Sequence, residues 1–530
     1  MRKIIREEFF SIFQPKPGAI KDIRKRSGDF MKLFRHQVFW PPFLLLVGTL
    51  IFSLMDAENF LEKANVLNDF VLEKFGWLFS AGTALMLLVC IVAYFHPIGK
   101  QKIGGADAEP FLNRWRWFSI VLCTTVATGI IFWGTAEPIY HLTNPPSFKG
   151  LEPNSAEAAN NALSTMYLHW SFTPYAIYSV PAVMFALAFY NNKRSFSLKS
   201  TLYPFVKEGK ANWLATVIDS ICLFALVAGM AASLGAGILT LSGGLNSVFE
   251  FDGGRWLLLI TLLVVSAFVI SAITGLMRGI RILSDINIRV FFALALFVFF
   301  AGPTVEIISG AASALWDYFI HLPEDSVVSM LQPDDPWPKS WTTFYWANWL
   351  AWAPITSLFL GRLGYGYTVR QFLTFNWILP SLFGIFWMSV FSGTALHLQL
   401  SGTDLADLTA SDNPEGVIYA LFEALPLSKI LAAIFLFTAF LSYVTAADSN
   451  TEAMGGISST GISPESPSPP VLIKIVWGLT IGTVAFLMVK LAGIDGIKML
   501  SNLGGLPALF LIITVTIGLI WVMMKTGSKR

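Results

Sequence analysis

The sequence is poor in charged residues, and this shortage excludes several classes of protein. Charged residues make up 13% of the 530 residues, about half of the roughly 25% that is usual in soluble domains. The 36 Lys and Arg residues and the 34 Asp and Glu residues leave a formal net charge of +2. Because neither sign dominates, the composition indicates no nucleic acid and no acidic macromolecule as a partner.

Cysteine and histidine are also scarce, which argues against an enzyme or a metalloprotein. The three cysteines, Cys90, Cys123 and Cys222, lie in separate apolar runs without the paired spacing of a metal or redox site. The six histidines are scattered, and only His169 lies well inside an apolar run. There is no metal-ligand spacing, nucleophile elbow or phosphate-binding loop. We therefore expect no catalysis, no ATP-driven pumping and no cofactor.

Apolar residues, by contrast, are abundant: they make up 55% of the chain and give a mean hydropathy of +0.62. A helix that crosses a membrane needs about 20 mostly apolar residues. Twelve segments meet this description, although Gly, Pro and polar residues blur their ends. The sequence therefore predicts an all-α polytopic membrane protein. Its twelve transmembrane helices centre on residues 40–55, 76–96, 117–140, 163–190, 212–242, 256–276, 287–310, 341–362, 371–396, 428–450, 471–492 and 499–524.

The loops between these segments differ in charge. Basic residues gather in residues 1–37, in the even-numbered loops and after the last span, whereas the seventh and ninth loops are acidic. Positive residues stay on the cytoplasmic side of a membrane, so we expect both termini to be cytoplasmic, and we expect no signal peptide. We interpret the basic N-terminal tail as a topogenic signal; contact with anionic lipid is the alternative.

Two groups of aromatic residues fall inside predicted spans. Trp346, Trp349 and Trp352 are three residues apart, so their rings line one side of a helix. Trp170 and Tyr178 share a face around Pro174 in the fourth span, and Tyr175 lies between them. Aromatic faces attract quaternary ammonium groups, although single rings in spans often serve packing or the membrane interface. Two such groups beside helix-breaking residues favour a carrier for a methylated-ammonium solute.

The third span contains small residues, at Ala127, Gly129 and Gly134, and then the pair Glu137-Pro138. An unwound stretch here would free backbone groups for an ion or a carboxylate, whereas tight helix packing is an equally good interpretation. For Glu137 we expect a capping or structural role near the outer end of the span.

Hydroxyl and charged side chains lie in two later spans. The tenth span runs from Ser442 to Thr451, and Thr445 is a candidate ion ligand there. Asp448 is costly at this depth unless it is paired, so we expect it to cap a helix or bind a partner. Arg289 opens the seventh span, where it either extends to the cytoplasmic surface or supplies a fixed positive charge in place of a bound cation.

Five motifs of this chain, in the same order, resemble those of the betaine/choline/carnitine transporter family. They are Gly134–Pro138, the His169 to Tyr178 segment, residues 232–235, residues 341–354 with the Gly361-Arg362-Leu363 that follows, and Thr445–Ser449. The resemblance covers residues 40–524 and implies a LeuT-like pair of inverted five-helix repeats, a homotrimer and a bacterial cytoplasmic membrane. The implied parts are a basic tail (1–37), two peripheral helices (38–116), the first repeat (117–310), an external linker with a short helix (311–340) and the second repeat (341–530).

The resemblance also implies a solute site, which we call the aromatic box: Trp170, Tyr175, Tyr178, Trp349 and Trp352. Phe344 would be a gate-side aromatic residue, and the backbone of 127–129 would meet the carboxylate of the solute. Asn348 replaces the first Trp of a family Trp-Trp pair, and Tyr175 replaces a Trp of glycine betaine carriers. The box is therefore smaller and more polar, as would suit carnitine or another hydroxyl-bearing betaine. Gly129 lacks the acidic neighbour of choline carriers, which favours a zwitterion.

The family's sodium sites are altered in this chain. Thr445-Ala446 replaces a Thr-Ser pair, and Leu226 and Met230 replace threonines of the fifth span. Sodium-independent exchangers of the family resemble this pattern, with an arginine near Arg289. The remaining candidate ion-coupling residues are Thr445, Val126 and Ser442. We expect weak or absent sodium coupling; a sodium- or proton-coupled choline or betaine symporter is the alternative, and a transporter-like membrane sensor is the alternative from another class.

Overall fold

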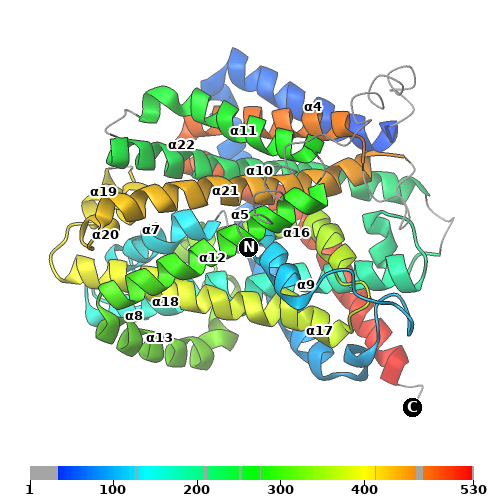
Figure 1. Cartoon of the computed structure of the whole chain (residues 1–530), viewed down its shortest axis with the longest axis horizontal. Coiled ribbons are helices and arrows are strands. Elements are labelled where there is room, and N and C mark those ends of the chain that lie inside the picture. Colours follow the sequence, from blue (N-terminus) through cyan, green and yellow to red (C-terminus); the bar gives the residue numbers. More distant parts are fainter. Residues whose placement is uncertain are drawn as a thin grey trace, which may run out of the picture.

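The fold is almost entirely helical. The computed structural model describes residues 34–125, 129–207, 212–249, 253–274, 276–411, 413–460 and 469–527. In these residues, extended backbone pairs only at two isolated bridges, Phe34 with Ser459 and Lys102 with Thr368. Figure 1 shows α10, α11 and α21 side by side across the molecule. The all-α class predicted from the apolar segments is thus confirmed.

The main helices follow the predicted apolar segments. In the first half of the chain they are α4 (His36–Met55), α5 (Ala57–Phe95), α6 (Arg114–Thr125), α7 (Gly129–Thr143), α8 (Ala156–Trp170), α9 (Phe172–Ala186), α10 (Asn212–Phe249), α11 (Leu257–Thr274) and α12 (Leu276–Ala301). In the second half they are α13 (Thr304–Asp325), α14 (Val328–Leu331), α15 (Pro336–Pro338), α16 (Phe344–Leu363), α17 (Val369–Leu373), α18 (Leu379–Leu400), α19 (Ala406–Ala410), α20 (Gly416–Glu423), α21 (Ser428–Ser458) and α22 (Val471–Gly527).

Fewer helices than the twelve predicted spans meet the length and composition of a membrane crossing. In the described part of the chain, eight helices are long and apolar enough to cross a membrane, or nine if α6 and α7, which are bent by 55°, form one span. The last two predicted spans are joined in α22, which turns at Gly493 (φ 52°, ψ −131°). The predicted span 287–310 is too long, because α12 ends at Ala301 before Gly302-Pro303. Twelve crossings therefore remain a prediction.

The fourth predicted span is broken rather than bent. α8 ends at Trp170, Ser171 leaves the helical region (φ −127°, ψ −118°), and α9 starts at Phe172. Pro174 explains the position of the break, because a proline ring collides with the carbonyl four residues earlier, which here is that of Trp170. The break places the C-terminal end of α8 inside the helix bundle.

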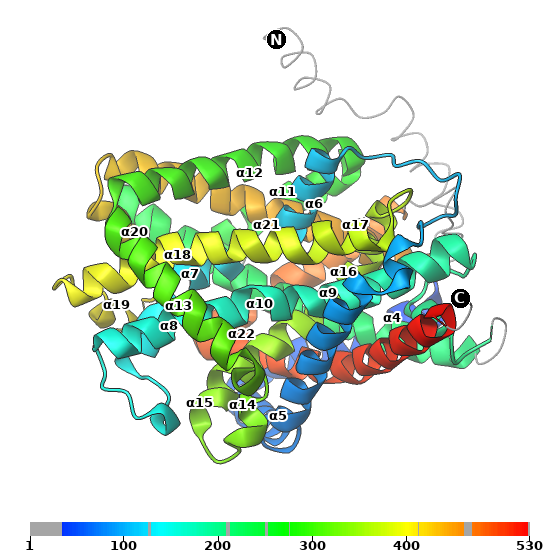
Figure 2. The same ribbon diagram turned by 90° about the horizontal axis from the view of Figure 1, so that it is seen from below.

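Small residues bring the central helices close together. A Cβ atom added at Gly505 in α22 would lie 2.4 Å from the carbonyl oxygen of Ala347 in α16, so only glycine fits there. In Figure 2, α13 lies across α8 and α18 on the outside of this bundle. The bundle therefore surrounds α16, which carries the largest group of aromatic residues.

Candidate functional site

Trp349 is the centre of a buried group of aromatic rings. Its ring centroid lies 5.5 Å from that of Trp170, 5.6 Å from that of Tyr175 and 5.3 Å from that of Tyr178. The interplanar angles are 73°, 61° and 66°, so the rings meet edge to face, the arrangement that aromatic pairs prefer. None of the four side chains is more than 4% exposed. The structure thus brings together rings that lie in α8, α9 and α16.

The broken helix fixes the orientation of Trp349. The indole N–H of Trp349 donates to the carbonyl oxygen of His169 at 3.1 Å. The last carbonyls of a helix have no partner within that helix, and α8 ends directly after His169, at Trp170. The same break that places Trp170 therefore supplies the acceptor that holds Trp349.

A small pocket with a volume of about 20 Å³ lies against these rings. Six helices contribute to it, and it is lined by Thr124, Thr125, Gly129, Trp170, Tyr178, Ser233, Asn348, Trp349 and Trp352. Among the residues that the structure describes, its lining contains aromatic, hydroxyl and amide groups but no ionised side chain. Four of the five predicted box residues thus line this pocket, namely Trp170, Tyr178, Trp349 and Trp352. The fifth, Tyr175, contacts the ring of Trp349.

Two glycines allow tryptophan rings to approach the pocket. A Cβ atom at Gly129 would lie 2.5 Å from the Trp170 ring, and one at Gly229 would lie 2.9 Å from the Trp352 ring. Either substitution would displace a ring, because real Cβ atoms do not approach so closely. Gly129 therefore allows a close approach to the neighbouring Trp170 ring, which is one of the two interpretations that the sequence left open.

Asn348 lines the pocket. Its side-chain oxygen accepts a hydrogen bond from the Ser501 hydroxyl of α22 at 3.1 Å, and the residue is partly buried. A Trp at this position would have an apolar ring where Asn348 has an amide. The pocket wall is accordingly more polar here than a pair of tryptophans would make it.

Phe344 does not line the pocket. Its ring lies 5.8 Å from Trp133 and 4.9 Å from Tyr345, and the Lys498 ammonium is 5.6 Å from its centroid. The same ammonium lies 4.0 Å from the ring of Trp341. Phe344 thus belongs to a neighbouring aromatic layer. Val126 and Ala127 lie outside the described residues, so their predicted contacts stay predictions.

The candidate ion ligands of the tenth predicted span bond within the protein. The Thr445 hydroxyl donates to the Leu441 carbonyl at 3.0 Å, and the Ser442 hydroxyl donates to the Thr438 carbonyl at 2.8 Å. Ser442 also accepts a hydrogen bond from the Asn287 amide at 2.8 Å. Both hydroxyls are buried in α21, beside α6, which lines the pocket.

Arg289 is not brought to these groups. Its side chain is 66% exposed and pairs with Asp285, one helical turn earlier, at 2.9 Å. The expectation that Arg289 replaces a bound cation therefore finds no support in its position, and the surface-directed alternative matches it. The rotation of α12 about its axis depends on packing against neighbouring helices, so the sequence pattern does not distinguish the two positions of Arg289.

Glu137 has a larger role in the site than the sequence indicated. Its carboxylate is fully buried in the middle of α7, which excludes helix capping. One oxygen pairs with His169 Nδ1 at 2.6 Å and with His141 Nε2 at 3.1 Å. The other accepts from Trp170 Nε1 at 2.8 Å and from the Tyr345 hydroxyl at 2.5 Å. A single carboxylate thus holds Trp170 of the box and ties α7 to α8 and α16.

Glu137, His141 and His169 are also residue types that bind metal ions. Among the described residues, Glu137, His141 and His169 form the one group of His, Cys, Asp or Glu side chains whose ligand atoms all lie within 4.8 Å of one another. The carboxylate already accepts four hydrogen bonds from these and neighbouring groups. The arrangement therefore fits a buried hydrogen-bond network around the carboxylate, although the Nδ1 atom of His141 has no hydrogen-bond partner among the described residues.

Known proteins resemble this chain over nearly its whole length. An ectoine/hydroxyectoine transporter of Virgibacillus pantothenticus is 31% identical, over 92% of this chain and 95% of that protein. The glycine betaine transporter OpuD of Bacillus subtilis (strain 168) is 28% identical, over 89% of this chain and 91% of that protein.

A solved structure of a Na+-coupled sialic acid symporter in a substrate-bound outward-open state is also similar. It has 17% identity and a TM-score of 0.46, and the match covers 84% of this chain and 85% of that one. The model of the betaine/carnitine/choline family of transporters matches residues 37–528. The chain therefore belongs to the betaine/carnitine/choline transporter family.

Proposed function

We propose that this protein is a secondary transporter that moves a zwitterionic betaine across the bacterial cytoplasmic membrane by alternating access, as a homotrimer with cytoplasmic termini. The observation that carries the proposal is the buried group of rings around Trp349 beside the small pocket. Rings in a desolvated site attract an organic cation by ~2 kcal/mol or more each. Membership of the family supports transport of such a solute.

The polar groups of the pocket favour a zwitterion over a plain cation. The described lining residues include no carboxylate that would balance a bound cation. They do offer the Ser233 hydroxyl and the Asn348 amide, and such groups donate hydrogen bonds to a carboxylate or a hydroxyl of the solute. Carnitine, which has both, suits these groups better than choline does.

The proposed coupling is sodium-independent or of the exchange type. A hard cation needs several oxygen ligands. Leu226 is a fully buried hydrophobic residue, and Met230 and Ala446 line one small cavity of mainly apolar side chains between α10 and α21. These residues replace oxygen ligands of the family's sodium sites, while Arg289 no longer contributes to the proposal.

Uptake of radiolabelled carnitine and glycine betaine into proteoliposomes tests solute and coupling together. We expect uptake of at least one betaine that changes less than about twofold when the sodium gradient is removed, because sodium contributes no more than ~0.4 kcal/mol if it is not coupled. Preloading the vesicles with the same solute should increase the rate if exchange operates.

The proposed coupling and the proposed solute preference can each be contradicted by a separate result of this experiment. Uptake that disappears without sodium would overturn the proposed coupling but leave the solute assignment intact. Choline uptake at the betaine rate would overturn the preference for a zwitterion. Vesicles without the protein provide the background for both comparisons.

A further inference from the structure

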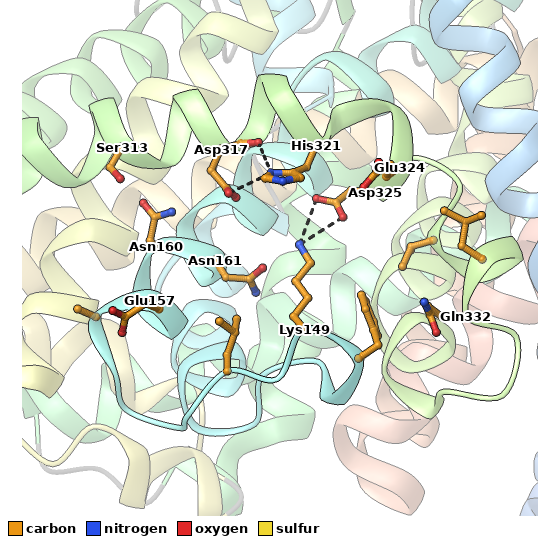
Figure 3. A pocket seen from close by; sticks show the side chains of 15 residues that line it. Lys149, Glu157, Asn160, Asn161, Ser313, Asp317, His321, Glu324, Asp325 and Gln332 are labelled. Atoms are coloured by element: carbon orange, nitrogen blue, oxygen red, sulfur yellow. Dashed lines mark hydrogen bonds and ion pairs between the residues drawn. The ribbon is translucent and has the colours of Figure 1, made fainter.

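A second and larger pocket lies outside the aromatic box. It has a volume of about 700 Å³ and lies between the segment around Lys149 and α8 on one side and α13 and α14 on the other (Figure 3). Small-molecule sites typically have about 300–1,000 Å³. We call it the outer pocket, because it is formed by the third and seventh predicted loops and adjoining helix ends, on the side opposite the predicted cytoplasmic termini.

Acidic groups dominate the lining of the outer pocket. Its carboxylates are those of Glu157, Asp317, Glu324 and Asp325, whereas Lys149 is its one lysine or arginine among the described lining residues. The Lys149 ammonium already pairs with Asp325 at 3.3 Å. Burial raises the pKa of Asp325, and Lys149 opposes that shift. The remaining carboxylates favour a ligand with a positive charge.

Two asparagines of α8 add unsatisfied hydrogen-bonding groups. Asn161 is only 5% exposed, and its side-chain nitrogen has no hydrogen-bond partner among the described residues. The side-chain oxygen of Asn160 is buried and likewise has none in this part of the chain. Figure 3 shows both amides on the α8 side of the pocket, opposite Asp317. A buried polar group without its hydrogen bond is unfavourable, so a ligand that bonds to both amides gains affinity.

The acidic groups do not converge as ligands of a metal ion do. The one converging set of three such side chains in the described residues is that of Glu137, away from this pocket. The donors are spread over two helices instead, with Asp317 and His321 paired at 3.1 Å on α13 and the asparagines on α8. A spread of this kind suits an organic ion rather than a compact metal ion, which needs six or more oxygens at about 2–2.6 Å.

The small number of aromatic rings in the lining of the outer pocket indicates which kind of cation it would bind. Among the 15 lining residues in the described part of the chain, only Phe148 and His321 carry aromatic rings. A quaternary ammonium group has no N–H and depends on ring faces, whereas a primary ammonium group donates hydrogen bonds to carboxylates and to an amide oxygen. We propose that the outer pocket binds a small zwitterion of the amino-acid type, with its ammonium toward Asp317 and the Asn160 oxygen and its carboxylate toward the Asn161 amide.

A ligand in the outer pocket would affect the aromatic box through contacts of α13. Tyr318, next to Asp317, accepts a hydrogen bond from the Ser171 hydroxyl at 3.2 Å, and its ring lies 6.2 Å from that of Tyr167. Ser171 is the residue at which α8 breaks after Trp170. A ligand that bridges α8 and α13 therefore reinforces the contacts that position Trp170, without occupying the box.

Binding of N-methylated glycines to the purified full-length Trp349→Ala variant tests this proposal, because that variant lacks the central ring of the box. Glycine, N-methylglycine, N,N-dimethylglycine and glycine betaine lose one N–H at each step and keep their carboxylate. We expect equilibrium dialysis to show glycine binding that is retained in the variant and weakens along the series. Asp317→Asn and Asn161→Ala, each added to Trp349→Ala, should each weaken glycine binding by about tenfold, the value of one charge-assisted or buried hydrogen bond.

Glu306→Gln is the matched control, because Glu306 is an exposed acid on the same helix, α13, and does not line the pocket. Equal glycine affinity in the Asp317→Asn and Glu306→Gln proteins would overturn the proposal. So would affinity that rises with methylation, or glycine binding that is lost with Trp349. If the wild-type protein does not bind glycine betaine, the proposed transport function is overturned instead. Failure of the outer-pocket proposal and failure of the proposed transport function are therefore distinguishable.

Discussion

Replacement of Trp349 by alanine is expected to abolish betaine uptake. Trp349 is the only ring of the box in contact with Trp170, Tyr175 and Tyr178 together, so its loss removes one ring face and the support of the others. One desolvated cation–π contact contributes ~2 kcal/mol, which corresponds to about a thirtyfold loss of affinity before the other rings move. Uptake at a fixed betaine concentration in proteoliposomes measures the effect, and Trp352→Ala should behave alike.

Trp346→Phe provides the matched control for this prediction. Trp346 is in the same helix and is fully buried, with its ring 5.9 Å from that of His169, but it does not line the pocket. Truncation of a buried Trp to alanine destabilises a protein by about 3–5 kcal/mol, so Trp349→Phe should be measured as well. Wild-type uptake in folded Trp349→Ala protein would discard the site assignment.

Replacement of Glu137 by alanine is expected to have the second large effect, on stability as well as uptake. The change leaves His169, His141, Trp170 and Tyr345 without their shared acceptor in a fully buried position. Each unmade buried hydrogen bond costs about 1–3 kcal/mol, so the melting temperature should fall by several degrees and Trp170 should lose its orientation. Thermal unfolding of the purified protein and proteoliposome uptake measure the two effects.

Glu137→Gln separates charge from shape in this network. The glutamine amide keeps one oxygen acceptor but places an N–H₂ group among donors, so we expect a folded protein with strongly reduced uptake. Glu152→Gln, at an exposed glutamate of the loop after α7, serves as the control. If the Glu137→Ala protein has the melting temperature and uptake of the wild type, the Glu137 network neither stabilises the bundle nor orients Trp170.

The aromatic box was predictable because helical spacing and helix-breaking residues leave a clear trace in the sequence. Trp349 and Trp352 are three residues apart in α16, and Pro174 marks the region where α8 and α9 separate. The exact break at Ser171 follows from the clash of the proline ring with the carbonyl of Trp170. The sequence pattern alone suggested a bend, because it does not show which carbonyl finds another partner.

The contacts between distant segments were not predictable in the same way. Glu137 and Tyr345 are 208 residues apart and meet only in the packed bundle. The available signal was that an unpaired carboxylate is unfavourable at membrane depth. This signal indicates that the carboxylate has partners, but it does not identify them. The positions of Phe344 and Arg289 depend on helix rotation, which is decided by packing against neighbouring helices and not by local spacing.

The most direct test of the aromatic box compares glycine betaine with its carbon isostere, 3,3-dimethylbutanoate, in binding to the wild-type protein. The two molecules share shape and carboxylate, but the isostere has a neutral tert-butyl group in place of the trimethylammonium group. If the rings around Trp349 hold a cation, glycine betaine should bind at least about thirtyfold more tightly, as expected for one cation–π contact of ~2 kcal/mol. Equal affinities in isothermal titration calorimetry would contradict the account.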